Sequence, residues 1–147
     1  STGNETPYAR STQAGNREAA VVIYGVGTDI VRVARMQDNL QEYGDKFARR
    51  ILSDNEFSDF STSKSPAHFL AKRFAAKEAT AKAMGIGFSR GLSLSNIGVG
   101  HDENGKPVLE LTGRAAELCD ELGIGESYIS IADEEDHAVA FVTLLAR

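Results

Sequence analysis

The sequence has 147 residues, of which 41% are hydrophobic, and it carries a formal net charge of −5 at pH 7. This length and composition predict one globular domain with a modest core. The acidic balance argues against general nucleic-acid binding, and no apolar run approaches the roughly 18 residues of a membrane span. Because Cys119 is the only cysteine, an internal disulfide framework and a cysteine-built metal site are excluded. We expect a cytoplasmic protein.

The N-terminal stretch differs in composition from the rest of the chain. Residues 1–19 contain no Val, Ile, Leu, Met or Phe. Because such a stretch has little apolar surface to bury, we expect a disordered tail or an expression remnant. Order is expected from Ala20, with a short buried strand over residues 21–24. The single domain is therefore assigned to residues 20–147.

The first candidate functional residue follows this strand. Gly25 and Gly27 indicate a break after the strand, and Thr28 or Asp29 would cap a helix whose apolar spacing begins at Ile30. An Asp at a strand-to-helix junction is either such a cap or a ligand or catalytic group. The residues alone leave both interpretations of Asp29 open.

Basic side chains follow in the next part of the chain. Arg32 and Arg35 lie in the expected first helix, and Lys46 and Arg49 are interleaved with apolar side chains in residues 44–52. A solvated charge run is the ordinary interpretation of such a segment. The alternative is a local docking surface for an acidic partner, which the overall negative charge does not exclude.

Two further helices have clear boundary signals. Residues 53–60 begin with a Ser-x-x-Glu capping box, in which two side chains and two backbone N–H groups satisfy one another. Residues 65–87 have the marks of one long helix, since Pro66 suits the first helical position and Gly85 and Gly87 supply the stop. This long helix is rich in alanine, so other backbone can come close to it.

Two charged residues of the long helix are candidate functional residues. Glu78 and Lys82 lie one turn apart, on a strip beside the apolar stripe of the helix. We expect them near the edge of a buried face. The alternative is an ordinary surface ion pair at i,i+4, with a stabilisation of about 0.2–0.5 kcal/mol.

The C-terminal half is expected to consist mostly of strands. Asn104-Gly105 is a strong hairpin signal, because both residues tolerate positive φ. The last strand is apolar on both faces, as expected for a central or interface strand. Cys119 falls at helical spacing with Leu118 and Leu122, which favours a core thiol. The expected elements are strands over residues 97–102, 106–112, 128–133 and 138–145, and a helix over residues 113–123.

Residue chemistry alone supports a limited functional hypothesis. Asp29 and Glu78, with Lys82, Arg73 and Lys77 near Glu78, would suit a hard divalent cation and a phosphorylated ligand. Nothing in the spacing proves that the two carboxylates meet.

Four short sequence blocks carry a family resemblance. They are Gly-Val-Gly-Thr-Asp-Ile at 25–30, Phe-Leu-Ala-Lys-Arg-Phe-Ala-Ala-Lys-Glu-Ala-Thr-Ala-Lys at 69–82, Gly-Ile-Gly at 85–87 and Asn-Gly-Lys-Pro at 104–107. Their order and separations resemble the signature blocks of bacterial holo-acyl-carrier-protein synthases, the short type of 4′-phosphopantetheinyl transferase. The resemblance runs from about Val21 to Leu145. It implies an α+β domain with an antiparallel sheet packed against the long helix, and a homotrimer with active sites shared between subunits.

The resemblance also implies a reaction and its principal residues. Members move 4′-phosphopantetheine from coenzyme A to a serine of apo acyl carrier protein in fatty-acid synthesis, leaving adenosine 3′,5′-bisphosphate. By position, Asp29 and Glu78 become Mg²⁺ ligands, and Lys82 binds the pyrophosphate and stabilises the leaving phosphate. These three residues are the catalytic candidates. A metal-bound water or Glu78 itself would accept the serine proton, and the sequence does not choose between them.

Further residues are assigned through the same resemblance. The candidates for coenzyme A binding are Arg73, Lys77, Lys82, Gly85 and Gly87. Arg35 matches the characteristic arginine of the family's docking helix, so the candidates for carrier-protein binding are Arg35, Arg32, Lys46 and Arg49.

Two observations limit and support this interpretation. Residues 131–133 lack the histidine that some relatives carry there, so no catalytic role is assigned to a histidine at that strand. The rival hypothesis is a non-enzymatic trimeric module that binds nucleotide or carrier protein. The presence of Asp29, Glu78 and Lys82 together favours the enzyme, because a binding module would not need all three.

Overall fold

The computed structural model describes residues 20–147, and the tail predicted over residues 1–19 lies outside the described residues. A three-stranded antiparallel sheet has the order β1 (Ile23–Arg32), β5 (His137–Ala146), β4 (Ile124–Asp133). A separate antiparallel hairpin consists of β2 (Ile97–His101) and β3 (Pro107–Leu111). The helices are α2 (Val33–Tyr43), α3 (Asp45–Ile51), α4 (Asp54–Ser61), α5 (Pro66–Met84) and α6 (Gly113–Leu122), with a 3₁₀ turn η1 (Leu94–Asn96). The predicted α+β class with an antiparallel sheet is confirmed.

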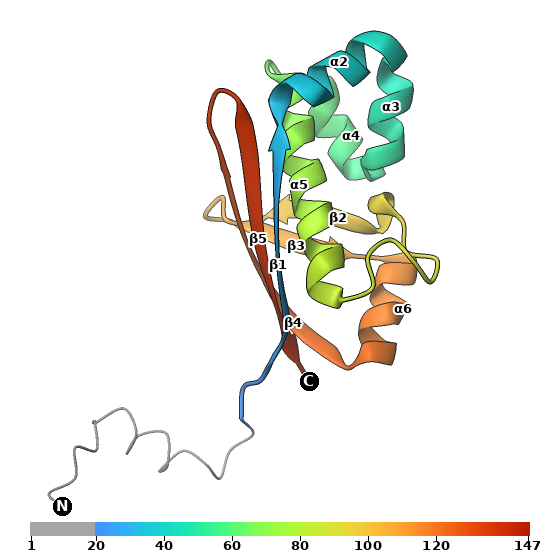
Figure 1. Cartoon of the computed structure of the whole chain (residues 1–147), viewed down its shortest axis with the longest axis vertical. Coiled ribbons are helices and arrows are strands. Elements are labelled where there is room, and N and C mark those ends of the chain that lie inside the picture. Colours follow the sequence, from blue (N-terminus) through green and yellow to red (C-terminus); the bar gives the residue numbers. More distant parts are fainter. Residues whose placement is uncertain (1–19) are drawn as a thin grey trace, which may run out of the picture.

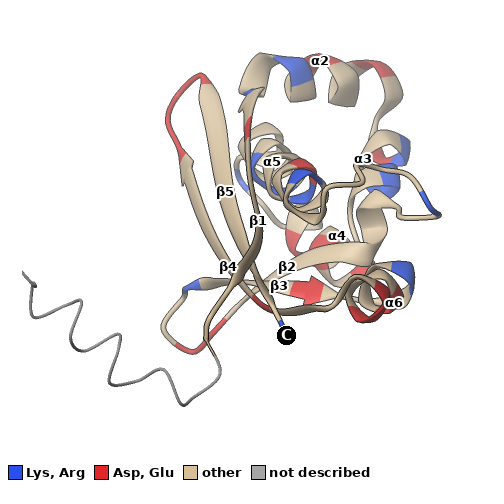
Figure 2. Ribbon diagram, turned by 60° about the horizontal axis from the view of Figure 1, so that its bottom comes forward, with Lys and Arg blue, Asp and Glu red and all other residues tan. Residues whose placement is uncertain are grey.

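Helix α5 runs through the middle of this arrangement. The sheet lies along one side of α5, and α3 and α4 lie on the other side, in both ribbon views (Figures 1 and 2). Helix α2 crosses near the N-terminal end of α5, while the β2–β3 hairpin and α6 lie toward its other end (Figure 1). Helix α5 therefore contacts the sheet, helices α2 to α4 and strand β2.

Most of the local boundary signals are confirmed. The capping box opens α4, where Ser53 N donates to Glu56 Oε1 at 2.9 Å and Glu56 N donates to Ser53 Oγ at 3.3 Å. Helix α5 begins at Pro66 and ends at Met84, and its C-cap Gly85 has a left-handed φ of 83°. The hairpin and α6 also form where their sequences predict them.

The predicted capping role of Thr28 or Asp29 is wrong. Strand β1 continues without a break through Gly25 and Gly27 and pairs with β5 as far as Arg32. Thr28 and Asp29 thus lie inside the strand, and Arg32 occupies the N-cap position of α2 without a side-chain cap bond. The glycines mark a close approach between elements, not the end of the strand.

The close approach is between β1 and α5. A Cβ atom on Gly25 would lie 2.1 Å from the carbonyl oxygen of Ala83, and one on Gly27 would lie 1.9 Å from that of Ala79. Two strand residues advance about 6.6 Å and four helical residues about 6 Å, so the two contacts repeat in step. Since alternate strand residues share a face, Asp29 follows Gly25 and Gly27 on the side toward α5.

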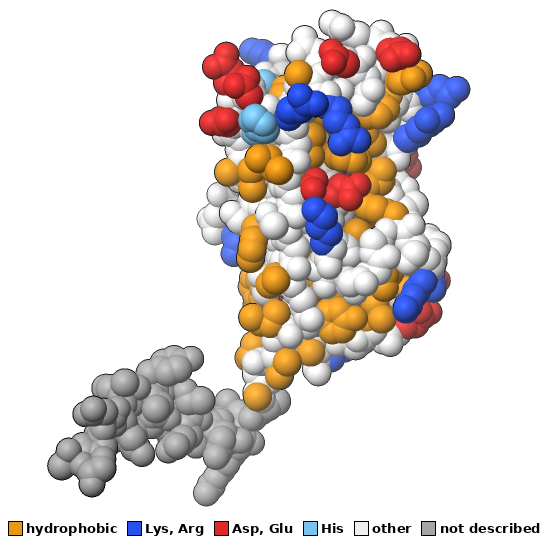
Figure 3. All heavy atoms as spheres, viewed as in Figure 1, with side chains coloured by type: hydrophobic (Ala, Val, Ile, Leu, Met, Phe, Trp, Pro, Cys, Tyr) orange, Lys and Arg blue, Asp and Glu red, His pale blue; other side chains and the backbone are white. Residues whose placement is uncertain are grey.

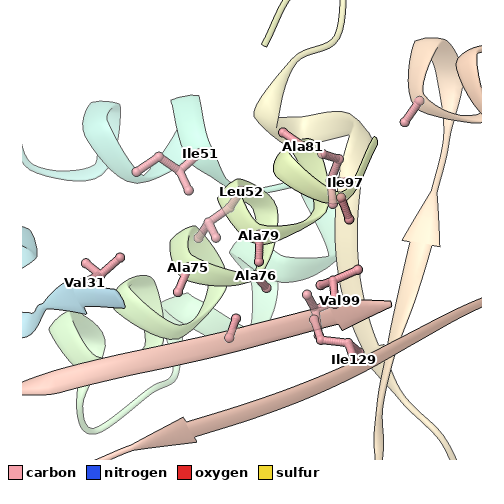
Figure 4. Close-up of a cluster of buried hydrophobic side chains, with 14 of the residues drawn as sticks. Val31, Ile51, Leu52, Ala75, Ala76, Ala79, Ala81, Ile97, Val99 and Ile129 are labelled. Atoms are coloured by element: carbon pink, nitrogen blue, oxygen red, sulfur yellow. The ribbon is translucent and has the colours of Figure 1, made fainter. Parts of the chain in front are cut away.

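The core fills the space around α5. Its alanines Ala75, Ala76 and Ala79 lie among apolar side chains from α3, β1, β2 and β4 (Figure 4). The inner face of β5 is fully buried and contributes Ala138, Ala140, Val142 and Leu144. Burial also raises the pKa of the Cys119 thiol, as expected of a core cysteine on α6.

The outer face of the same sheet is apolar and exposed. Ile30 of β1 is paired with Val139 of β5, and their side chains are 64% and 38% exposed. Phe141 of β5 and Tyr128 of β4 continue this surface, which Figure 3 shows as a run of hydrophobic side chains beside the sheet. We call it the outer sheet face. None of the helices in residues 20–147 is long and apolar enough to cross a membrane.

The contact between β1 and α5 yields a first prediction. Gly27→Ala should lower the free energy of unfolding by about 3 kcal/mol or more, because its methyl group would overlap backbone that cannot move aside. Chemical unfolding measures this loss. Gly98→Ala is the matched control, since its Cβ would lie no closer than 3.4 Å to any atom outside its chain neighbours. Equal stability of the two variants would contradict the close-packing argument.

Candidate functional site

Strand β1 and helix α5 bring three of the predicted site residues together. Lys82 Nζ of α5 donates to Asp29 Oδ1 of β1 at 2.9 Å and to the carbonyl oxygen of Thr28 at 3.0 Å. Glu78 lies one turn before Lys82 on the same helix. The Asp29–Glu78–Lys82 cluster is therefore a real neighbourhood, although its members come from distant parts of the sequence. Lys82 pairs with Asp29, so the alternative of a simple surface pair with Glu78 is not what the structure has.

The cluster is partly open to solvent. The side chain of Lys82 is 54% exposed and that of Asp29 is 18% exposed, and Glu78 is half-buried. Figure 3 shows acidic side chains in the middle of this face with basic side chains above and below them. A ligand from solvent can therefore reach the charged groups.

The two carboxylates interact unfavourably. Burial raises the pKa of Glu78, and the nearby Asp29 carboxylate raises it further, while the positive charges of Lys82 and Arg35 act in the opposite direction. The two carboxylates are thus close enough to repel each other, and Lys82 donates to Asp29 and to the carbonyl oxygen of Thr28. Such a pair is stabilised by a bound cation.

The donor set would suit a hard divalent cation such as Mg²⁺. Two carboxylates supply hard oxygen ligands, and Mg²⁺ usually keeps several waters and takes substrate phosphates for its remaining positions. The described residues contain no cluster of three or more His, Cys, Asp and Glu side chains that would hold a metal without such help. Asp29 and Glu78 are the residues that would hold the ion.

The structure does not bring Arg73 and Lys77 into this cluster, and their assignment to coenzyme A binding stays a prediction. Lys77 is fully buried, and its Nζ donates to Glu56 Oε1 at 2.6 Å and to the carbonyl oxygens of Leu94 and Ile97. Arg73 is 6% exposed and stacks over the ring of Phe69 at 4.4 Å. Both side chains point into the protein on another side of α5.

Sequence reasoning missed the partner of Lys77. Glu56 was recognised only as part of a capping box, yet it is 3% exposed and its carboxylate lies between α4, α5 and β2. Its Oε2 accepts from Val99 N at 3.1 Å and lies 3.5 Å from Arg73 Nε. Because the partners come from separate elements, no local sequence signal identifies this network.

Gly85 and Gly87 follow Lys82 of the Asp29–Glu78–Lys82 cluster by three and five residues in the sequence. Gly85 is the left-handed C-cap of α5, and Gly87 has φ of 59° in the following loop. A Cβ at either position would meet no atom within 4 Å, so their backbone faces open space. Their role in coenzyme A binding stays a prediction.

The residues predicted to bind the carrier protein lie at the end of β1 and on helices α2 and α3. Arg35 of α2 stacks over Phe74 of α5, with 5.3 Å between its guanidinium carbon and the ring centre. Arg49 of α3 stacks over Phe57 at 3.9 Å, and Arg32 and Lys46 are exposed. Figure 3 shows basic side chains on the upper part of this face, where Figure 1 places α2 and α3. We call these four residues the basic surface.

Known proteins share both the sequence and this fold. The model of the 4′-phosphopantetheinyl transferase superfamily matches residues 25–142. A holo-[acyl-carrier-protein] synthase of Nitrosococcus oceani is 59% identical over 126 residues, covering 86% of this chain and 82% of the relative. The crystal structure of the Neisseria meningitidis holo-[acyl-carrier-protein] synthase is 44% identical, with a TM-score of 0.80, and covers 84% of this chain and 98% of its own.

A further solved structure contains a ligand. The holo-(acyl-carrier-protein) synthase from Bacillus anthracis, in complex with CoA (3′,5′-ADP), is 35% identical with a TM-score of 0.72. It covers 87% of this chain and 100% of its own. The similarity thus includes a protein with a coenzyme A-type ligand.

The opposed carboxylates give a second prediction. Glu78→Gln should leave the free energy of unfolding in EDTA unchanged or higher, because a desolvated and repelled carboxylate becomes neutral. Calorimetry should show Mg²⁺ binding weakened by at least roughly 10- to 100-fold for Glu78→Gln and for Asp29→Asn, a loss seen even when only a supporting residue is removed.

The matched control is a carboxylate outside the cluster. Glu117 on α6 is exposed and pairs with Arg114, so Glu117→Gln should bind Mg²⁺ like the unmutated protein. If Glu78→Gln bound the ion equally well, the two-carboxylate site would be wrong.

Proposed function

The chain belongs to the 4′-phosphopantetheinyl transferase superfamily, and from this premise we propose that it is a Mg²⁺-dependent holo-acyl-carrier-protein synthase of the cytoplasm. Its reaction moves the 4′-phosphopantetheine group of coenzyme A to a serine hydroxyl of apo acyl carrier protein and releases adenosine 3′,5′-bisphosphate. The name of the Nitrosococcus relative and the ligand of the Bacillus structure support this proposal. The observation that carries it is the meeting of Asp29, Glu78 and Lys82 at one open edge.

In this reaction the two carboxylates would bind the metal ion, and one of them is a candidate proton acceptor. Asp29 and Glu78 would hold the metal ion, which when bound supplies charge neutralisation at the pyrophosphate of coenzyme A. The serine oxygen forms a bond to the β-phosphorus as the bond to the bridging oxygen of the leaving phosphate breaks. The serine proton would pass to Glu78 or to a solvent molecule.

Lys82 supplies the mobile positive charge. Its ammonium group is half exposed and is held by Asp29 and one carbonyl oxygen. An exposed ion pair of this kind contributes little stability, so the long side chain can turn toward the pyrophosphate at small cost. There it would stabilise the negative charge that collects on the departing bisphosphate. The rival binding module would use the same three residues without turnover.

One assay tests the proposed function directly. The protein is incubated with apo acyl carrier protein, coenzyme A and Mg²⁺, and the carrier is examined by mass spectrometry. The expected result is addition of one phosphopantetheine group to the carrier serine, and none when Mg²⁺ is removed by EDTA. An unchanged mass of a competent carrier would reject the enzyme and favour the binding module.

The outer sheet face supports a trimer with active sites shared between subunits. Ile30, Val139, Phe141 and Tyr128 place large apolar side chains side by side on this face. Contiguous exposed apolar surface of this kind marks interaction sites in water-exposed domains. A second copy of the chain is the occupant that the family resemblance favours.

A third prediction follows for assembly. Phe141→Asp should dissociate the trimer or make the protein insoluble, because the carboxylate would be desolvated without a partner. Light scattering gives the oligomeric state. Tyr43→Asp is the control, since Tyr43 is 57% exposed at the end of α2, away from the sheet. A fully active monomer of the unmutated protein would exclude the trimer.

The basic surface supports docking of the carrier. Acyl carrier proteins are strongly acidic, so Arg32, Arg35, Lys46 and Arg49 provide complementary charge. Arg35 is held in place by stacking on Phe74, and its charge acts on Glu78. A carboxylate of the carrier bound by Arg35 would therefore lie close to the reacting groups.

A fourth prediction separates carrier binding from coenzyme binding. Arg35→Ala should raise KM for the carrier and leave KM for coenzyme A almost unchanged, because a bidentate pair with a carrier carboxylate is lost. Higher salt should raise the carrier KM of the unmutated protein more than that of the variant, since exposed charges are screened over about 8–10 Å. Lys106→Ala in the β2–β3 turn is the control. Identical salt responses with an unaltered KM would locate docking elsewhere.

A further inference from the structure

The buried Glu56–Lys77 pair has no place in the open cluster, yet it is attached to the same helix. Lys77 is the largest fully buried side chain in the described part of the chain. It is adjacent in sequence to Glu78, which faces the open cluster. Burying a charged side chain costs free energy, so the position of Lys77 indicates a role other than stabilising the fold.

The composition of α5 indicates that this role is to fix the rotation of the helix. Between Leu70 and Met84, the buried residues of α5 are alanines apart from Arg73, Lys77 and Thr80. An alanine surface has shallow ridges and grooves, which do little to fix how a helix is rotated against its neighbours. The close contact with β1 places Ala79 and Ala83 of α5 against the strand through backbone atoms, so side chains on the other faces of the helix supply the remaining constraint on its rotation.

Of the three buried polar residues, Lys77 connects α5 most firmly to other elements. Thr80 Oγ1 donates within the helix to Ala76 O at 2.7 Å. Arg73 stacks on Phe69 of the same helix, and its Nε has no hydrogen-bond partner among residues 20–147. Lys77, in contrast, donates to Glu56 and to two backbone carbonyls of η1 and β2.

Glu56 is fixed in turn by backbone groups. Its Oε1 accepts from Ser53 N as well as from Lys77, and its Oε2 accepts from Val99 N. The pair therefore joins α4, α5 and β2 at one point. Because all of the hydrogen bonds need Lys77 in one direction, they hold α5 at one rotation about its axis.

That rotation determines where the catalytic side chains point. Successive helical residues are about 100° apart, so Glu78 and Lys82 lie about 100° and 140° round from Lys77. The sheet and α4 are on opposite sides of α5 in Figures 1 and 2. Fixing Lys77 toward α4 and β2 thus directs Glu78 and Lys82 toward Asp29 on β1.

We propose that Glu56 and Lys77 are positioning residues for the transfer reaction, which set the rotation of α5 and so keep Glu78 and Lys82 in register with Asp29. This inference rests on the proposed function. Neither residue touches a substrate, and both act through the backbone of α5. Ion pairs that specify an arrangement instead of adding stability are known in other buried settings.

The test uses the double variant Glu56→Gln/Lys77→Met in the full chain. It removes both charges of the pair together, and the charge of Arg73, which lies 3.5 Å from Glu56, is then offset by Asp59 alone. We expect a folded protein in which Mg²⁺ affinity measured by calorimetry falls roughly 10- to 100-fold, as for residues that orient metal ligands. The value of kcat should fall by a similar factor, while KM for the carrier should change less, because Arg32, Lys46 and Arg49 of the basic surface lie on β1 and α3.

A matched control distinguishes positioning from general destabilisation. Leu118 on α6 is fully buried, and α6 packs on β4 and η1, so Leu118→Ala should lower the melting temperature and leave Mg²⁺ affinity unchanged. If the double variant does not fold, Glu56→Asp keeps the charge and shortens the side chain, and it should show a smaller loss of the same kind. Mg²⁺ affinity and kcat equal to those of the unmutated protein, in whichever of these variants folds, would overturn the proposal, as would an equal loss in Leu118→Ala. Absence of transfer by the unmutated protein would instead reject the proposed function.

Discussion

The backbone contact between β1 and α5 is the constraint on which the rest of the structure depends. Gly25 and Gly27 lie against the carbonyl oxygens of Ala83 and Ala79, with no space for a side chain between them. Only this spacing allows Asp29, two residues further along the strand, to meet side chains that rise from the helix. The absence of side chains at two positions therefore creates the place where charged side chains converge.

Helix α5 contributes to two charged clusters, which differ in their net charge and in their exposure to solvent. In the buried one, Glu56 and Lys77 are paired, and their oxygens and nitrogen are occupied by hydrogen bonds. In the open one, two carboxylates share one lysine, and burial together with Asp29 raises the pKa of Glu78. The buried cluster suits a fixed structural joint, because Glu56 and Lys77 are closed off from solvent and their charged atoms are hydrogen-bonded. The open cluster has two carboxylates and one lysine, so a bound cation would offset its excess negative charge.

Signals that depend on a few neighbouring residues could be predicted from the sequence. The capping box at Ser53, the first-turn Pro66 and the Asn104-Gly105 turn were sufficient because each acts through local backbone geometry. The strand was predicted too short because Gly25 and Gly27 indicate a break unless the helix that packs on them is known. The buried partners of Lys77 could not be predicted for the same reason, since they come from α4, η1 and β2. The pairing of Asp29 with α5 came from the family resemblance, and residue spacing did not supply it.

The alternation of β1 links the two surfaces that the proposed function needs. Gly25, Gly27 and Asp29 face α5, while Val26 and Ile30 belong to the opposite, exposed face of the same strand. In the proposed trimer, the subunit that covers the outer sheet face would press on the strand that carries Asp29. Displacement of β1 away from α5 would separate Asp29 from Glu78 and would also disturb that interface. Assembly and metal binding would therefore stabilise the same position of β1, so each should strengthen the other.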